Sequence, residues 1–280
     1  TVPARNKPLD HAEQRRVKAD YPGVRQRARE SFFGVDVELA EVNARSALDV
    51  SDDERSAVYE EMWEHGGLRI AAAFADLLLS PQANDTAADF VRAKIRATVH
   101  DKDVAEKLVP TGYPIFAKRL CVDTGYYETF NRPNVTLVDL RESPLLEVTP
   151  GGIRTGGGEY PVDSIVLATG FDAMTGAASA IDIRGRGGAA LTDAWADGPR
   201  AYLGLAVAGF PNLFLVTGPG SPSVLSNMVT SIEQHVEWIA DCLAALRTRG
   251  AATIEASVEA QDGWMAHVDE VANLTVYPLA

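Results

Sequence analysis

The chain has 280 residues, of which 46% are hydrophobic and 23% charged, and its formal net charge at pH 7 is −13. This composition is typical of a folded protein with one large domain or two small ones, and argues against an intrinsically disordered chain. The negative charge, without a cluster of Lys and Arg, argues against a nucleic-acid-binding surface.

Membrane and secretion signals are not predicted. No apolar run approaches the roughly 20 residues that a membrane-spanning helix needs, and the first residues lack the apolar core of a signal peptide. Cys121 and Cys242 are the only cysteines and have no metal-ligand spacing. Reduced thiols in a cytoplasmic protein are therefore expected, and no metal site is predicted.

Helical patterns dominate the first hundred residues. Ser51 and Glu54 have the spacing of a capping box ahead of a helix predicted over 56–79. A second helix is predicted over 85–101, because the spacing of five residues puts the apolar side chains on one face: Phe90, Val91, Lys94, Ile95 and Val99. Pro and Gly then end the helical period near residue 110, and aromatic residues follow. These helices are expected to be structural.

Short apolar segments predict strands in the second half. Segments 134–140 and 145–170 indicate a meander that leads into one buried central strand, which begins at Ser164 and ends in a glycine turn. A further strand is predicted over 211–218, ahead of the loop 218–227. The next helix is expected to end at Gly250 and to carry its apolar side chains on one face: Val229, Ile232, Val236, Ile239, Leu243 and Leu246.

Two glycine-rich stretches approach the dinucleotide-binding pattern. Residues 185–190 have the spacing but lack a following helix, so they are not expected to bind a dinucleotide. The loop 218–223 has a strand before it and a helix after it, yet Pro219 and Pro222 lack the amide donors that a phosphate needs. It is interpreted either as a loop along a flat ligand or as an ordinary surface loop.

Lys118 and Arg119 are adjacent cations in an apolar and aromatic segment, where charges usually have anionic partners. Arg offers a planar fork of donors suited to an oxyanion or peroxide in a desolvated site, and Lys suits a phosphate. Structural ion pairs with carboxylates are an equal alternative. His235 is interpreted as a packed or surface histidine of its helix rather than a ligand.

Several long blocks resemble one family in order and spacing: VPARNKPLD, KRLCVDTGYYETFNRPNVTLVDL, IVLATGFDAMTG, GPRAYLGLAVAGFPNLFLVTGPGSPSVLSNMVTSIEQHVEWIAD and the final YP. Together they are similar to the C-terminal portion of a Baeyer–Villiger monooxygenase, a class B flavoprotein monooxygenase, nearest to the phenylacetone monooxygenase subgroup. The resemblance implies an NADPH- and FAD-dependent enzyme that uses O2 to insert one oxygen atom into a ketone, which gives an ester or lactone.

The implied fold is an α/β flavoprotein with two dinucleotide-binding domains, of which this chain holds a part. Residues 1–115 correspond to a helical insertion of the NADP domain, 116–171 to the returning part of that domain, and 172–280 to the closing part of the FAD domain. The segment ATGFD then resembles the crossing between the two domains, so that Asp172 would face the cleft between the cofactors.

The resemblance also assigns site residues. Arg119 matches the active-site arginine that stabilises the peroxyflavin anion, and Lys118 matches the lysine that binds the NADP 2′-phosphate. Asn227 and Met228 match positions against the flavin. The substrate pocket is implied at Ser223, Val224 and Leu225.

The fingerprints for FAD and NADP and the family's signature motif do not occur in these 280 residues. The chain is therefore expected to need an N-terminal segment of the same enzyme as its partner, and not to hold FAD or to catalyse the reaction alone. Two alternatives are a flavin-dependent N-hydroxylating monooxygenase and a non-catalytic module of the same ancestry.

Overall fold

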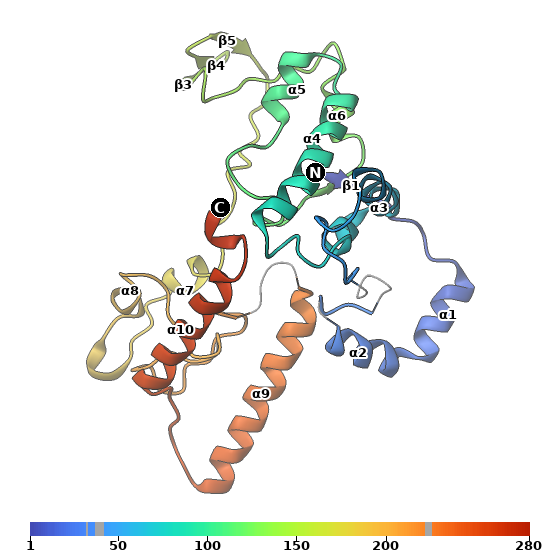
Figure 1. The fold of residues 1–280 in the computed structure, drawn as a ribbon. Coiled ribbons are helices and arrows are strands. Elements are labelled where there is room, and N and C mark those ends of the chain that lie inside the picture. The colour runs from blue at the N-terminus through green and yellow to red at the C-terminus, as the bar shows by residue number, and fades with distance from the viewer. Residues whose placement is uncertain (32, 37–41, 222–225) are drawn as a thin grey trace.

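The computed structural model describes residues 1–31, 33–36, 42–221 and 226–280. Its main elements are β1 (Val2–Pro3), α1 (His11–Ala19), α2 (Tyr21–Glu30), α3 (Asp52–His65), α4 (Pro81–Thr98), α5 (Lys102–Leu108), β2 (Val122–Asp123), α6 (Tyr126–Thr129), β3 (Leu145–Thr149), β4 (Gly152–Thr155), β5 (Gly158–Pro161), α7 (Gly176–Ser179), α8 (Leu191–Ala194), α9 (Met228–Arg249) and α10 (Val258–Asn273). Short 3₁₀ turns span Gly67–Ala72, Arg186–Gly188 and Tyr277–Leu279. Figure 1 shows α3–α6 in the upper part of the molecule, α7–α10 in the lower part, and α1 and α2 at the lower right, with α2 beside α9.

The predicted helix start at Ser51 is confirmed, because the Ser51 hydroxyl accepts a hydrogen bond from the Glu54 amide. The side chain of Glu54 pairs with Arg45 instead of completing the capping box. The prediction of a single helix over 56–79 is wrong, since α3 ends at His65. Gly66 follows with a φ of 72°, a left-handed conformation that stops the helix and that glycine adopts without strain.

A helical core is formed by residues between Ala47 and Phe116, together with Val2. Its largest fully buried side chains include Tyr59, Ile70, Phe74, Leu77 and Ile95. The helix expected over 85–101 is confirmed by α4, whose apolar face packs into this core. The parallel pair of β1 and β2 joins the N-terminal residues to the segment just after residue 119.

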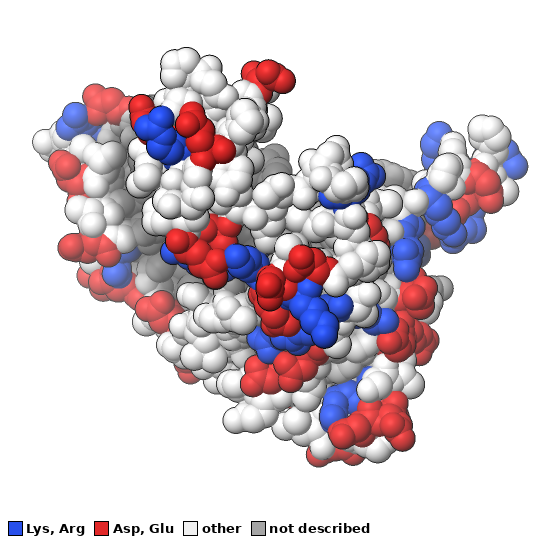
Figure 2. All heavy atoms as spheres, turned by 90° about the horizontal axis from the view of Figure 1, so that it is seen from above, with Lys and Arg blue, Asp and Glu red and all other residues white. Residues whose placement is uncertain are grey.

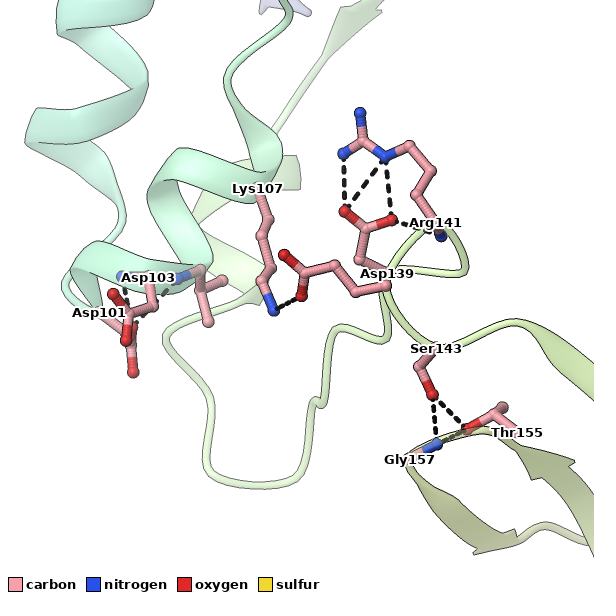
Figure 3. Close-up of polar contacts among 10 residues, drawn as sticks. Asp101, Asp103, Lys107, Asp139, Arg141, Ser143, Thr155 and Gly157 are labelled. Carbon is pink, nitrogen blue, oxygen red and sulfur yellow. Dashed lines mark hydrogen bonds and ion pairs between the residues drawn. The ribbon is translucent and has the colours of Figure 1, made fainter.

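The meander is confirmed over its central part, where β3, β4 and β5 form an antiparallel sheet. Figure 1 shows this sheet at the edge of the molecule, beyond α5. The turn before β3 is tied to α5 by an ion pair of 2.6 Å between Lys107 and Glu142. Figure 3 shows Ser143 beside Thr155 and Gly157 at the end of the sheet, and Arg141 beside Asp139, where its hydrogen bond lowers the pKa of the carboxyl to about 2.

Three predicted strands are wrong: segments 134–140, 164–170 and 211–218 contain no strand. Their apolar residues are strand-like, but a strand also needs a neighbour to accept and donate its backbone hydrogen bonds. Among the described residues no ladder lies beside these segments. The expected burial of 164–170 is also wrong, since Val166 is 88% and Leu167 81% exposed, and the following Phe171 is 99% exposed.

A second, smaller core lies among the residues before α9, with Leu191, Trp195, Ala201, Val207 and Phe210 buried. The long helix is confirmed as α9, and Gly250 caps it with a φ of 62°. Its apolar face is exposed at Val229, Ile232, Val236 and Leu243.

Helix α2 contacts α9 through charges. Arg25 pairs with Glu233 at 2.6 Å, and Arg29 pairs with Glu237 at 2.6 Å. On the face drawn in Figure 2, basic and acidic side chains alternate, and no broad area has one sign. No helix in the described part of the chain has the length and apolar content to cross a bilayer.

Candidate functional site

Lys118 and Arg119 lie on the segment that leaves the helical core after α5. This segment is fixed by Asn84 of α4, which is 1% exposed. The Asn84 side-chain amide donates to the carbonyls of Leu77 (2.9 Å) and Ile115 (2.8 Å), and its oxygen accepts from the Ile115 amide at 3.0 Å. The next residue, Phe116, is buried and has a left-handed φ of 71°. This turn brings the two following cations to the surface.

A cavity of about 260 Å³ lies beside these cations. Lys118 and Arg119 both line it, together with apolar and aromatic side chains that include Tyr113, Ile115 and Tyr126. The Lys118 ammonium lies 4.6 Å from the centre of the Tyr113 ring, a cation–π contact that orients the lysine. Apolar walls with two cations suit a ligand that has a flat apolar part and an anionic group.

The two predicted cations therefore meet in one cavity, but the desolvated surroundings expected for Arg119 are not found. Both side chains are exposed. The apolar neighbours that suggested desolvation, Ile115 and Phe116, turn inward to the helical core and leave the cations at its rim.

The other predicted residues lie elsewhere. Asp172 is exposed in the segment that follows the meander. Asn227 caps α9, where its side chain accepts from the Val229 amide at 3.1 Å, and Met228 is the first residue of that helix. None of the three lines the cavity beside Lys118. Ser223, Val224 and Leu225 fall outside the described residues.

A larger cavity, of about 520 Å³, lies between α9, α10 and the residues before α9. Its walls include Leu205, Trp238, Trp264 and Val268, and its polar groups include Ser221 and His235. The Ser221 hydroxyl is buried and has no hydrogen-bond partner among the described residues. The sequence interpretation missed this cavity, although His235 lies three residues after Ile232 and so borders the apolar face of its helix.

His235 is buried, as the packed alternative predicted, with 6% of its surface exposed. Its Nδ1 accepts a hydrogen bond of 2.9 Å from the Thr217 amide. Burial lowers the pKa of the imidazole below its usual value, so the neutral form is favoured. Because Nδ1 is the acceptor, the ring proton is on Nε2.

Comparisons with known proteins show that the full chain is similar to monooxygenases. A Baeyer–Villiger monooxygenase from Pseudooceanicola batsensis is 41% identical over 100% of this chain and 50% of its own length. A phenazine N-monooxygenase from Lysobacter antibioticus is 41% identical over 99% of this chain and 50% of its own length. The chain thus spans about half the length of these curated relatives. No family model matches the chain.

Solved structures give the same result. The structure of an oxidized steroid monooxygenase bound to NADP has 50% identity and a TM-score of 0.92, over 99% of this chain and 52% of that one. The OTEMO complex with FAD and NADP has 38% identity and a TM-score of 0.95, over 100% of this chain and 52% of that one. The expected fold is confirmed: the chain has part of the two-dinucleotide-binding-domain flavoprotein fold.

Proposed function

We propose that this chain is part of a monooxygenase that uses FAD and NADPH. Its whole length is similar to about half the length of a Baeyer–Villiger monooxygenase. The proposed reaction consumes a ketone, O2, NADPH and a proton, and releases an ester or lactone, water and NADP. The observation that carries the proposal is the 41% identity along all 280 residues, including the segments that hold Lys118, Arg119 and Met228.

The residues beside Lys118 fit a phosphorylated dinucleotide. Its ammonium is exposed at an apolar cavity and oriented by the ring of Tyr113. A lysine in this setting supplies a point charge for a phosphate, while the aromatic walls suit a base. We therefore assign Lys118 to the 2′-phosphate of NADP, a role that predicts a preference for NADPH over NADH.

The loop before α9 fits a flat ring system such as that of FAD. A Cβ at Gly204 would lie 2.3 Å from the Ser221 Cβ, and one at Gly218 would lie 2.7 Å from the Gly204 oxygen, so these backbones approach one another closely. Two further residues, Asn227 and Met228, stand at the N-terminus of a 22-residue helix, whose free amides favour partial negative charge. These features support the assignment of Asn227 and Met228 to the flavin. Ser223, Val224 and Leu225 are proposed to line the substrate pocket.

When bound, FAD and NADPH supply the reducing equivalents and the activation of O2. The protein must stabilise the negative charge that develops on the carbonyl oxygen of the ketone when its carbonyl carbon is attacked. An arginine side chain carries a positive charge and five N–H donors in a planar fork, so Arg119 can stabilise this charge. Arg119 is therefore the proposed catalytic residue, and Asp172 is proposed to face the cofactors from the segment between the two domains.

The proposal also names the partners of the protein and its location in the cell. A ketone and O2 are the proposed small-molecule partners, and the N-terminal half of the same enzyme is the proposed polypeptide partner. The location is proposed to be cytoplasmic, which the free thiols of Cys121 and Cys242 support.

The test uses the full-length protein that contains these residues, loaded with FAD and supplied with NADPH, a ketone and ¹⁸O₂. We expect ester or lactone with one ¹⁸O atom per molecule, and the second ¹⁸O atom in water. The same protein without NADPH is the control and should give no product. Oxidation of NADPH without a labelled ester, over a panel of cyclic and aryl ketones, would contradict the proposal.

A second function is favoured by one observation, the 41% identity to a phenazine N-monooxygenase. If this chain belongs to an enzyme of that kind, a phenazine under the same conditions should give a labelled N-oxide while ketones give nothing. Protein that binds no flavin would instead indicate a non-catalytic module.

A further inference from the structure

The loop 217–221 is held from three sides. At its start, the Thr217 amide donates to His235 of α9 at 2.9 Å. In its middle, the Gly218 amide donates to the Gly204 carbonyl at 3.0 Å. Near its end, the indole of Trp264 in α10 donates to the Gly220 carbonyl at 3.0 Å. Helix α9 begins at Met228, seven residues after Ser221.

The first of these contacts fixes a strained residue. Thr217 has a φ of 54°, a left-handed conformation that a β-branched residue rarely adopts. Such a conformation persists only where the surrounding structure determines it. The amide of Thr217 points to a half-buried region, so without an acceptor it would lose its hydrogen bond with little access to water.

We propose that His235 is a positioning residue for oxygenation: as a neutral imidazole, it holds the turn at Thr217 and so directs the loop 217–221 toward the start of α9. The inference rests on the proposed function, because it links the loop 217–221 to the flavin that Asn227 and Met228 are proposed to contact at the start of α9. In the held loop, the buried Ser221 hydroxyl lines the same cavity as His235. This hydroxyl is thus kept available to a group bound in this cavity.

The hold on Thr217 depends on the charge of His235. A protonated imidazole is a donor at both nitrogens, so Nδ1 would face the Thr217 amide as donor against donor. The position of the loop is therefore expected to change as the pH falls through the pKa of His235, and the proposed reaction should slow in the same range. Burial favours the neutral form and places this change on the acid side of the usual histidine range.

Other titratable groups face the same cavity and must be separated from His235. On α9 the neighbouring Gln234 does not titrate. From α10, His267 lines the cavity, with Glu270 at 4.0 Å from its Nδ1. After α10, Tyr277 also lines it, and tyrosine titrates far above this range. His267 is therefore the matched control.

The experiment compares three variants in the FAD-loaded, full-length protein. His235→Asn keeps an acceptor near the place of Nδ1 but cannot be protonated, and His235→Leu has no acceptor. His267→Asn changes the exposed histidine of the same cavity. Two quantities are measured between about pH 5 and 8, a range set by histidine titration: kcat for the ketone, and hydrogen exchange at the Thr217 amide, normalised to the rate of an unfolded peptide.

We expect the parent and His267→Asn to share a fall in kcat and in Thr217 protection at low pH. In His235→Asn, kcat and the protection of the Thr217 amide should both stay as high at low pH as they are at neutral pH. In His235→Leu the normalised exchange at Thr217 should be about tenfold faster at every pH, as the loss of one hydrogen bond predicts. If Leu prevents folding, the pH profile of Asn decides.

An unchanged acid limb in His235→Asn overturns the proposal, as does full Thr217 protection in a folded His235→Leu protein. Failure of the proposed function is a different result. It would appear as no ketone oxidation by the parent, while Thr217 exchange still reports whether His235 holds the loop.

Discussion

Replacing Asn84 by Ala should destabilise the protein and disturb the cavity beside Lys118. The side chain of Asn84 makes three hydrogen bonds inside the helical core, two of them to the backbone of Ile115 and one to Leu77. Ala removes all three and leaves buried backbone groups without partners. Ile115 lines the cavity and stands three residues before Lys118.

The expected loss can be derived from these contacts. A neutral hydrogen bond contributes about 1 kcal/mol to stability, and Ala recovers roughly 0.5 kcal/mol through its better helix propensity. Asn84→Ala should therefore lower the free energy of unfolding by about 2–3 kcal/mol. The Michaelis constant for NADPH should also rise, because the turn that presents Lys118 is no longer fixed.

Urea denaturation of the full-length protein measures the first effect, and steady-state kinetics the second. The control is Asn273→Ala, which removes a single exposed hydrogen bond to the Asp269 carbonyl and should change stability by less than about 0.5 kcal/mol. A loss under about 1 kcal/mol in Asn84→Ala would refute the reasoning. It would show that the Ile115 backbone groups find other partners.

Lys118→Ala should raise the Michaelis constant for NADPH about tenfold or more and that for NADH little, because only NADPH carries the 2′-phosphate; steady-state kinetics with both cofactors measures this, and equal effects would exclude the role. Arg119→Ala should abolish ester formation with FAD still bound, as product analysis and the flavin spectrum can show; oxygenation near the parental rate would exclude Arg119. Folding lowers the pKa of His235 below its usual 6.5, so below pH 6.5 the unfolded state binds more protons than the folded state. The protein should therefore lose stability as the pH is lowered through this range. Thermal unfolding of His235→Asn should lack that contribution, and an identical pH profile in parent and variant would count against it.

The helices were predictable because their signals are local. The cap at Ser51, the apolar face of α4 and the stop at Gly250 are each encoded within a few residues. The strands were predictable only where their partners follow directly in sequence, as in the meander from β3 to β5. Segments such as 164–170 have the composition of strands, but a neighbouring strand cannot be read from the segment itself.

The candidate site shows the same division. Charge within an apolar segment was enough to single out Lys118 and Arg119, and the cavity places them together. Their exposure was not predictable, because it results from the turn at Phe116. That turn is held through the preceding Ile115, whose backbone bonds to the side chain of Asn84, 31 residues earlier in the chain. The hold of His235 on Thr217 joins residues 18 apart in the same way.

These two contacts share a physical logic. Asn84 and His235 are two of the four buried polar residues that the described part of the chain contains. Each bonds the backbone beside, or at, a non-glycine residue in a left-handed conformation, Phe116 in one case and Thr217 in the other. Each such turn comes shortly before residues that the proposal assigns to a cofactor. A buried polar group costs stability unless its hydrogen bonds are satisfied. It therefore restricts the backbone to few arrangements, which a purely apolar contact at the same place would not do.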